Sequence, residues 1–345
     1  MTHNVLTGNR NTLGTRGVDL TGVGAGRQHL VIDLTTPGSG TQQLIGIGGA
    51  SSLAGAPSGD GIATASVSSG GGGVVSVDSA HTTAASKPAS TLTVGQAAHL
   101  DAASIAIASS SAGNVGGSTD NNDGGFVAVA SGDSSISTNN TAGVVVNDSA
   151  TLDAAQDVEI TSTSSQSAST LTDISSKGFA GVPKANATAT VDYESKVDVH
   201  AATITAGNQM IIDARSNVAG AVTVNSDGRG AGSGSHANDS DDNDKGLFIG
   251  NTRALTQTTV HEDASLTAKA LLLKATVTSV DASVEATAYG DGLGGNSNAE
   301  ARLRMTDTTA VILDAASQLT GDEVSLTAAH NDIVVTSHSD STCDC

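Results

Sequence analysis

The chain has 345 residues, and its composition excludes several classes of protein. Aromatic residues are only 1% of the total, with three Phe, two Tyr and no Trp, which is too few for an ordinary globular core of this length. Fifteen Lys and Arg stand against 35 Asp and Glu, a formal net charge of −20, so nucleic acid and anionic membrane surfaces are not expected partners. No apolar run approaches the roughly 18 residues of a membrane helix, so no membrane insertion is expected.

The first part of the chain, residues 1–69, has the least regular sequence. Alternating apolar residues at 28–34 predict a strand, residues 44–47 suggest another, and 48–61 has the composition of a loop. The glycines at 22–26 precede a strand instead of following one, which argues against a dinucleotide-binding fingerprint. We expect irregular strands and loops here, or the start of the repeat that follows.

The N-terminus carries no recognisable secretory signal, because the start MTHNVLTGNRNTLG lacks a charged beginning and an apolar stretch. Two explanations remain open: a cytosolic protein, or an internal piece of a longer secreted chain. We favour the second, because the repeat is already in progress near the N-terminus and is interrupted after Leu326. An extracellular or cell-surface location is therefore expected, with the signal outside this sequence.

Residues 70–336 repeat one design. Each copy has a β-branched start, a central Leu or Ile, a small residue two positions later, and then an alternating apolar pair. The copies are 92–109, 144–162, 196–214, 257–275 and 310–328. The central residues, called anchors below, are Leu100, Leu152, Ile204, Leu266 and Leu319, at intervals of 52, 52, 62 and 53. A fixed period of this length is typical of a solenoid, propeller or array.

The alternation within each copy predicts strands whose apolar side chains share an interior face. In pairs such as Ile105 and Ile107, both members point to the same side. Strand-like segments at Val74 and Phe126 each lie 26 residues before the next anchor, which is half of the period. The sequence therefore predicts an all-β parallel β-helix with about two rungs per 52-residue repeat, and a rod roughly 60–70 Å long. The ten additional residues of the third interval are assigned to the polar stretch 226–246, outside the buried layers.

Residues 337–345 are expected to form a frayed C-terminal tail, which contains the only two cysteines of the chain. Cys343 and Cys345 are separated by one residue, a spacing that strains an intramolecular disulfide. Together with His338 they fall short of the four ligands of a structural zinc site. No metal ion or other cofactor is therefore expected, and the role of the cysteines stays open.

Two acidic stretches are the best candidates for chemistry. Residues Asp239–Asp244 alternate carboxylates ahead of a glycine, as a Ca²⁺ loop would, but Thr252 occupies the position of the bidentate Glu. The stretch Asp120–Asp123 has the same character, and for both a solvated loop is the favoured interpretation. The nine His lack metal-binding spacing, and no Gly-x-Ser-x-Gly nucleophile elbow is set between a strand and a helix. The sequence therefore assigns no catalytic, cofactor-binding or metal-binding residue.

The units have the form V-x-x-x-A-x-L-x-A-x-x-x-V-x-I-x-A-x-S and are separated by stretches rich in Gly, Asn and Asp. Over about Gly70 to Thr336 they resemble the repeats of giant bacterial surface exoproteins, in particular the leukotoxin-type filamentous adhesins, and in style the filamentous haemagglutinins and autotransporter passengers. The resemblance implies a right-handed parallel β-helix that acts in adhesion at the cell surface. Its implied partners are a receptor or glycan on a host or neighbouring cell, and further repeats of the same parent chain.

The favoured function is a structural or adhesive stalk segment without catalysis, with the Gly-, Asn- and Asp-rich stretches displayed along one side. A polysaccharide-degrading β-helix enzyme is the first alternative, and it would need carboxylates and Arg or Lys converging in a groove, with aromatic platforms for sugars. Five aromatic and 15 basic residues supply these poorly. The second alternative is a calcium-stabilised exoprotein, whose thermal midpoint would fall when the metal is chelated.

Overall fold

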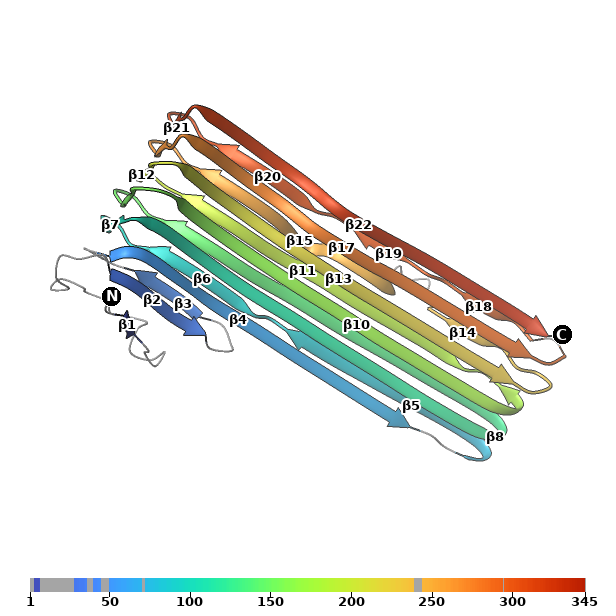
Figure 1. Cartoon of the computed structure of the whole chain (residues 1–345). Helices are drawn as coiled ribbons and strands as arrows, with labels where there is room; N and C mark the ends of the chain where they lie inside the picture. Colours follow the sequence, from blue (N-terminus) through green and yellow to red (C-terminus); the bar gives the residue numbers. More distant parts are fainter. Residues whose placement is uncertain are drawn as a thin grey trace.

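The computed structural model describes residues 3–6, 28–35, 40–44, 50–69, 72–238, 244–293 and 295–344. These residues form strands joined by short turns, and no helix occurs among them. The strands pair in parallel with partners from neighbouring repeats and wind into a flattened coil (Figure 1). The predicted all-β class and the parallel stacking of the repeats are therefore confirmed.

Each turn of the coil has three walls, and its two ends are called the base and the tip. The outgoing wall runs from base to tip, the return wall runs back, and the short wall closes the base (Figure 1). The outgoing wall contains β4 (Ala50–Ser69), the first half of β8 (Ser104–Val146), β10 (Val158–Gly181), β13 (Gln209–Arg229), β17 (Ala270–Asp291) and β22 (Glu323–Asp344), preceded by β1 (His3–Leu6) and β2 (Gln28–Thr35).

The return wall is more broken than the outgoing wall, because several turns carry interruptions there. It contains β3 (Gly40–Leu44), β5 (Gly72–Ser86), β6 (Ala89–Val94), the second half of β8, β11 (Lys184–Val199), β14 (Ser235–Ala237), β15 (Gly246–Val260), β18 (Ser297–Ala299), β19 (Leu303–Met305) and β20 (Thr308–Leu313). The short wall contains β7 (His99–Ala102), β9 (Thr151–Ala154), β12 (Thr203–Ala206), β16 (Ser265–Thr267) and β21 (Gln318–Thr320).

One 52-residue unit makes one complete turn of the coil. Val158 pairs with Ile105 of the preceding unit and with Met210 of the following unit, so paired residues are separated by a whole period. The prediction of two rungs per unit is therefore wrong. The strands near Val74 and Phe126 begin the return wall, where they face the outgoing wall of their own turn. A half-period in the sequence cannot distinguish a strand stacked on its neighbour from a strand that faces it.

The long dimension of the structure follows the strands, not the stacking axis (Figure 1). From β4 to β22 the outgoing wall has five strand-to-strand intervals, which at about 4.8 Å each give about 24 Å. A single strand such as β13, with 21 residues, extends about 70 Å at about 3.3 Å per residue. The predicted rod was expected to have this length along the stacking axis, and that direction is wrong. Each turn uses twice as many residues as expected, so the chain makes fewer turns with longer strands.

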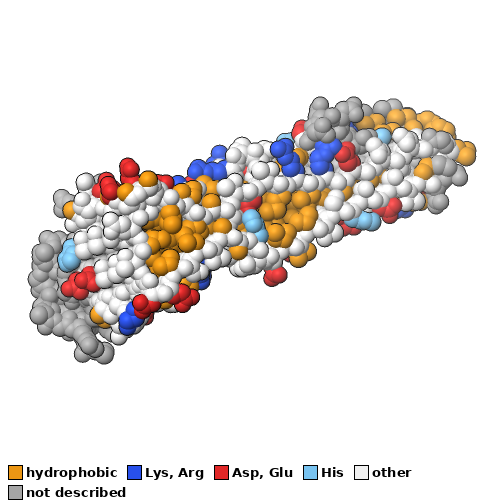
Figure 2. Space-filling view, turned by 90° about the horizontal axis from the view of Figure 1, so that it is seen from above, with side chains coloured by type: hydrophobic (Ala, Val, Ile, Leu, Met, Phe, Trp, Pro, Cys, Tyr) orange, Lys and Arg blue, Asp and Glu red, His pale blue; other side chains and the backbone are white. Residues whose placement is uncertain are grey.

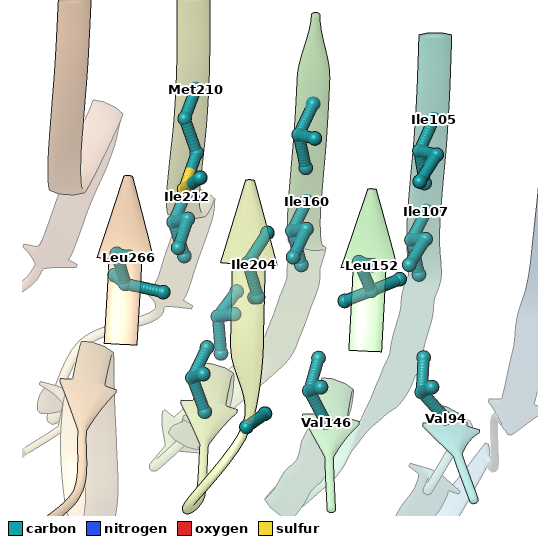
Figure 3. Packing of buried hydrophobic residues seen from close by; sticks show 14 of the residues in the cluster. Val94, Ile105, Ile107, Val146, Leu152, Ile160, Ile204, Met210, Ile212 and Leu266 are labelled. Carbon is teal, nitrogen blue, oxygen red and sulfur yellow. The ribbon is translucent and has the colours of Figure 1, made fainter. Parts of the chain in front are cut away.

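The anchors form one interior row, as the repeat predicts. Leu100 pairs with Leu152, Leu152 with Ile204, Ile204 with Leu266, and Leu266 with Leu319 along the short wall. The first four are at most 3% exposed. Apolar pairs of the outgoing wall, such as Met210 and Ile212, pack against this row together with valines of the return wall (Figure 3). Three walls meet here, so the base has room for large aliphatic side chains.

Away from the base only two walls face each other, and the space between them admits small side chains. A methyl group on Gly132 would lie 2.1 Å from Cδ1 of Ile174 across the interior. Gly117 similarly leaves room for Ile136, and Gly220 leaves room for Leu247. Large aliphatic side chains in this region therefore require a glycine opposite them, which explains why Gly, Ala, Ser and Thr dominate the sequence.

Hydroxyl groups fill part of the narrow interior and bond with each other across it. The Ser195 hydroxyl donates to Ser162 Oγ at 3.0 Å, and the Thr256 hydroxyl donates to Ser216 Oγ at 2.8 Å. All four side chains are fully buried. Burial of these four hydroxyls is tolerated because each finds a partner, so apolar packing at the base and hydroxyl pairs further along the walls both hold the core.

The ten additional residues of the third interval are distributed over three places. The offset between paired residues grows from 52 to 58 between β14 and β15, to 61 at a bulge within β15, and to 62 at the short wall. Only the first step lies in the polar stretch 226–246, so the assignment of all ten residues to it is wrong. The pairs that define these steps are Ala185 with Ala237, Thr188 with Gly246, Tyr193 with Ala254, and Thr203 with Ser265.

Both ends of the chain contain more regular structure than the sequence indicated. Strand β2 confirms the predicted strand at 28–34, but residues 50–61, expected to be a loop, belong to β4, which pairs with β8. At the C-terminus, residues 337–344, expected to be a frayed tail, continue β22 and pair with β17 as far as Asp344. Cys343 is disulfide-bonded.

A left-handed backbone position recurs where the return wall enters the short wall. Ala97 has a φ of 56°, and Ser149, Asp263 and Ala316 take similar values at the same place in other turns. Because a Cβ atom is unfavourable in this conformation, replacing Ala97 with Gly is expected to raise the free energy of unfolding by about 0.5–1 kcal/mol. The adjacent Gln96 is also exposed but lacks a positive φ, so Gln96→Gly should be destabilising. Urea denaturation of both variants measures the difference.

Candidate functional site

The acidic stretches do not form a metal site in the part of the chain that the structure describes. Within those residues, no group of three or more His, Cys, Asp or Glu could hold a metal ion. The stretch Asp120–Asp123 is not the expected solvated loop but part of β8, with Asp123 buried and accepting a hydrogen bond from the Ser76 hydroxyl. Most of Asp239–Asp244, residues 239–243, lies outside the described residues.

Five charged side chains gather on the outer face of the return wall. This charged cluster consists of Asp192, Glu194, Lys196, Asp198 and Arg253. Lys196 Nζ is 3.2 Å from Asp198 Oδ2 and 3.9 Å from Glu194 Oε1, which also contacts Arg253 Nη2. Asp192 and Glu194 are only 6% and 8% exposed. A convergence of carboxylates with Lys and Arg is what a polysaccharide-degrading enzyme would need.

Asp192 stabilises the bulge within β15. Four residues, 250–253, stand opposite Asp192 where the ladder between β11 and β15 shifts register. The main-chain N–H groups of Thr252 and Arg253 donate to Asp192 Oδ1 at 3.0 and 3.2 Å, and the Thr252 hydroxyl donates to Oδ2. Arg253, at the end of the bulge, then pairs with Glu194. The carboxylates of the cluster therefore hold an insertion in place, which is a structural role.

Replacing Asp192 with Ala is expected to lower the free energy of unfolding by about 2–3 kcal/mol, because two main-chain donors of the bulge lose a charged acceptor. Asp281, an exposed carboxylate on the outer face of β17, provides the control, and Asp281→Ala should change stability by less than about 0.5 kcal/mol. Chemical denaturation measures both. Equal stability of the two variants would show that the bulge forms without its carboxylate.

A second polar group lies inside the coil. Tyr193 is fully buried and pairs with Ala254, whose small side chain separates it from the position of Asp307 in the next turn. Asp307 in turn contacts His330 Nε2, and its Oδ2 accepts a hydrogen bond from Thr309 at 3.3 Å. Because the phenol has no exposed surface, a substrate could not reach it. The phenol is therefore part of the interior packing.

The environment of Tyr193 makes stability sensitive to alkaline pH. Burial, together with the negative charge of Asp307, raises the pKa of Tyr193 above its ordinary value of 10.0. In the unfolded chain the phenol ionises near pH 10, whereas in the folded chain it stays neutral. The contribution of the neutral phenol to the free energy of unfolding is therefore complete below pH 10 and is lost as the pH rises further. Tyr193→Phe should therefore flatten the decline of the unfolding free energy above pH 10. Tyr289→Phe, at the other tyrosine, should leave this decline unchanged.

The tip presents an exposed apolar surface. Phe126 of β8 and Phe179 of β10 are each 58% exposed, and their rings stack with centroids 4.9 Å apart and an interplanar angle of 2°. Val129 and Val182 are more than one third exposed beside them, and Leu293 is 84% exposed two turns further along the stack. Two of the three Phe of the chain thus lie side by side on the surface of the folded chain. An exposed apolar patch of this kind is typical of an interaction surface.

The sequence could not single out these residues. Phe126 and Phe179 are 53 positions apart, and their contact depends on the register of β8 and β10. The one available signal was that Phe179 lies within a stretch rich in Gly, Asn and Asp, and that Phe126 directly follows another, which ends at Gly125. Such stretches include Lys177–Pro183 and Gly290–Asn298, which contain the turns at the tip. The expectation that all of these stretches project along one side stays a prediction, because residues 113–125 lie within β8, which pairs with β10.

Comparison with known proteins provides no relative. No protein-family model matches the chain, and no match is found among curated proteins or solved structures. Among the residues that the structure describes, no helix is long and apolar enough to cross a membrane. Function is therefore inferred from the geometry of the coil and its tip.

Proposed function

We propose that the protein is a structural and adhesive segment of a bacterial surface adhesin of the filamentous type, without catalytic activity. The observation that supports this function is the stacked coil itself, which places the turns of successive repeats in a row and exposes Phe126 and Phe179 on that row. An adhesin needs an extended scaffold that presents the same kind of surface many times. The coil has this property, because every repeat makes one turn of the coil and so contributes one more connection to the row at the tip.

The handedness of the coil, its location and its place in a longer stack belong to the same proposal. We propose that the coil is right-handed, since parallel strands joined by a crossover are right-handed in nearly all known cases. We also propose that the protein is displayed outside the cell, as a segment of a longer stack. The last turn exposes Val324, Leu326 and Ile333, whose counterparts in the preceding turn are buried, and apolar side chains gather along this face (Figure 2). Such a face suits packing against another turn of the same design.

The arrangement of charged groups supports a role without catalysis. The carboxylates of the charged cluster accept hydrogen bonds from a bulge or pair with Lys196 and Arg253, so they are engaged in holding the wall together. The exposed Phe rings lie at the tip, whereas the charged cluster lies on the return wall. An enzyme acting on sugars would need both features in one groove.

Attachment of coated beads to cells tests the adhesive function. Beads that carry the purified chain should attach to mammalian or bacterial cell layers more than beads coated with albumin, and soluble chain added in excess should compete. Replacing both Phe126 and Phe179 with Ser should reduce attachment while the circular dichroism spectrum stays that of a β-protein. Attachment no greater than that of albumin on every surface tried, or release of reducing sugar from polysaccharides, would contradict the proposal.

A further inference from the structure

The last turn forms an open end of the coil, called the upper face below (Figure 1). It consists of β18, β19, β20, β21 and β22, and among the described residues each of these strands pairs only with the turn beneath it. β22 alone contributes an unpaired edge of 22 residues. Such an edge is a template on which another strand can pair.

The apolar interior of the coil is uncovered at the upper face. Leu326 and Ile333 are each 49% exposed, whereas their paired residues one turn below, Leu273 and Val280, are at most 1% exposed. What covers these two residues is the last turn, which has the same alternation of apolar residues. A surface of the same design as the upper face is therefore a suitable cover for it.

The upper face is large enough for a stable dimer. The 22 residues of β22 extend about 70 Å at about 3.3 Å per residue, and the two facing walls are about 10 Å apart. Contact between two such faces would bury about 700 Å² on each copy, or about 1,400 Å² in total. Specific protein interfaces bury about 1,200–2,000 Å².

The opposite end of the coil does not match the upper face. Near the base, β2 pairs with the start of β4 and β3 pairs with β6, whereas residues 59–69 of β4 pair only with β8 among the described residues. This end is therefore stepped, and a flat upper face could contact only part of it. Two upper faces have the same outline, and a two-fold axis along the strands places base on base and tip on tip. The outgoing wall of each copy then lies antiparallel on the return wall of the other.

We propose that two copies of this chain associate through their upper faces about this two-fold axis. The interface is isologous, because the same residues serve on both sides. Leu319 is the middle residue of β21 on the short wall, so the axis brings it opposite its counterpart in the second copy. The dimer depends on the open face and not on adhesion. It goes beyond the proposed function by naming the partner that occupies the face where a longer stack would add a turn.

The charge of the last turn makes the dimer sensitive to salt. Residues 297–344 contain eight Asp or Glu and two Arg, a net charge of −6. The two copies therefore repel each other, and salt shortens the range of this repulsion from about 30 Å at 0.01 M to about 3 Å at 1 M. We expect the dimer to be at least about tenfold tighter in 1 M than in 0.01 M NaCl.

Sedimentation equilibrium of the purified full chain tests the dimer. In 1 M NaCl we expect a Kd on the order of 1–10 μM. Leu326→Lys places a charge within the interface and should weaken the dimer at least about a hundredfold. Val334→Lys is the matched control, since it adds the same charge to the same strand but on the outer face, where Val334 is 57% exposed. This control should dimerise at least as tightly as the original chain.

Disulfide trapping tests the position of the axis. In a chain whose two native cysteines are replaced by Ser, Leu319→Cys should form a covalent dimer on mild oxidation. Opposite residues of antiparallel strands have Cα atoms about 4.5–5.5 Å apart, which is within reach of a disulfide. Thr327→Cys, on the outer face of β22, is the control and should stay monomeric on a non-reducing gel, because the axis places the two copies of this residue on opposite sides of the slab.

Three results would overturn the dimer: a monomer at up to about 1 mM chain in 1 M NaCl, equal weakening by Leu326→Lys and Val334→Lys, or no covalent dimer of Leu319→Cys. Oligomers that grow beyond two copies would also overturn it, in favour of stacking of the upper face on the opposite end. If Leu326→Lys lowers the thermal midpoint, Ile333→Lys replaces it. Bead attachment by a chain that stays monomeric contradicts the dimer alone. A dimer that does not attach contradicts the adhesive function alone.

Discussion

Replacing Gly230 with Ala is expected to destabilise the tip by more than about 3 kcal/mol, one of the largest effects of any single substitution in this chain. Gly230 has a φ of 148°, and a Cβ atom there would lie 1.5 Å from the carbonyl oxygen of Gly178 in the preceding turn. The obstacle is main chain, so it cannot rotate away as a side chain would. Gly178 and Gly292 stand at the same place in their turns and show the same close approach.

The measurement is a denaturant titration combined with amide exchange, because a repeat coil can open at the tip while the base stays folded. Gly124→Ala is the matched control, since its nearest neighbour would be a carbonyl oxygen at 3.9 Å, an ordinary contact. The control should change stability by less than about 0.5 kcal/mol. If Gly230→Ala were equally mild, the turns at the tip would not be stacked as closely as described.

Replacing Leu152 with Ala should lower the free energy of unfolding by about 2–5 kcal/mol, because it leaves a cavity at the centre of the base. Leu152 is fully buried and lies in the interior row between Leu100 and Ile204 (Figure 3). Leu171→Ala removes the same atoms from a side chain that is 41% exposed, and a loss of under about 1 kcal/mol is expected. Similar losses at the two positions would contradict the assignment of the anchors to the interior.

A double-mutant cycle tests whether the stack transmits this effect. Leu152 and Ile204 pair directly, so the combined substitution Leu152→Ala with Ile204→Ala should deviate from additivity by at least about 0.5 kcal/mol. Leu152 and Leu319 are three turns apart, and substitutions there should add within about 0.5 kcal/mol.

The sequence predicted the part of the fold that local periodicity determines. The anchors recur at a constant interval, and apolar pairs follow them, so strand positions and the interior row could be derived from the residues alone. The number of residues per turn could not be derived in this way. A strand 26 residues before an anchor satisfies the same pattern whether it stacks on the strand of the anchor or faces it across the interior. The mistaken solvated loop at Asp120–Asp123 has a related cause, since Asn121 and Asp123 are buried by a wall that the local sequence does not reveal.

The candidate site lay beyond sequence reasoning for a physical reason. Asp192 receives hydrogen bonds from residues about 60 positions away, and the stack of Phe126 on Phe179 spans 53 positions. Both depend on the register between turns, which insertions alter by single residues.

The flattened section has a mechanical consequence for any longer stack of such turns. Two facing sheets make a slab about 10 Å thick, whereas the long strands make it about 70 Å wide. Bending stiffness grows with the cube of the dimension in the bending direction and linearly with the other dimension, so such a ribbon would resist bending in its plane roughly 50 times more than out of it. A fibre of this protein would therefore curl easily to follow a curved surface on which its flat face lies, and it would resist sideways bending along that surface.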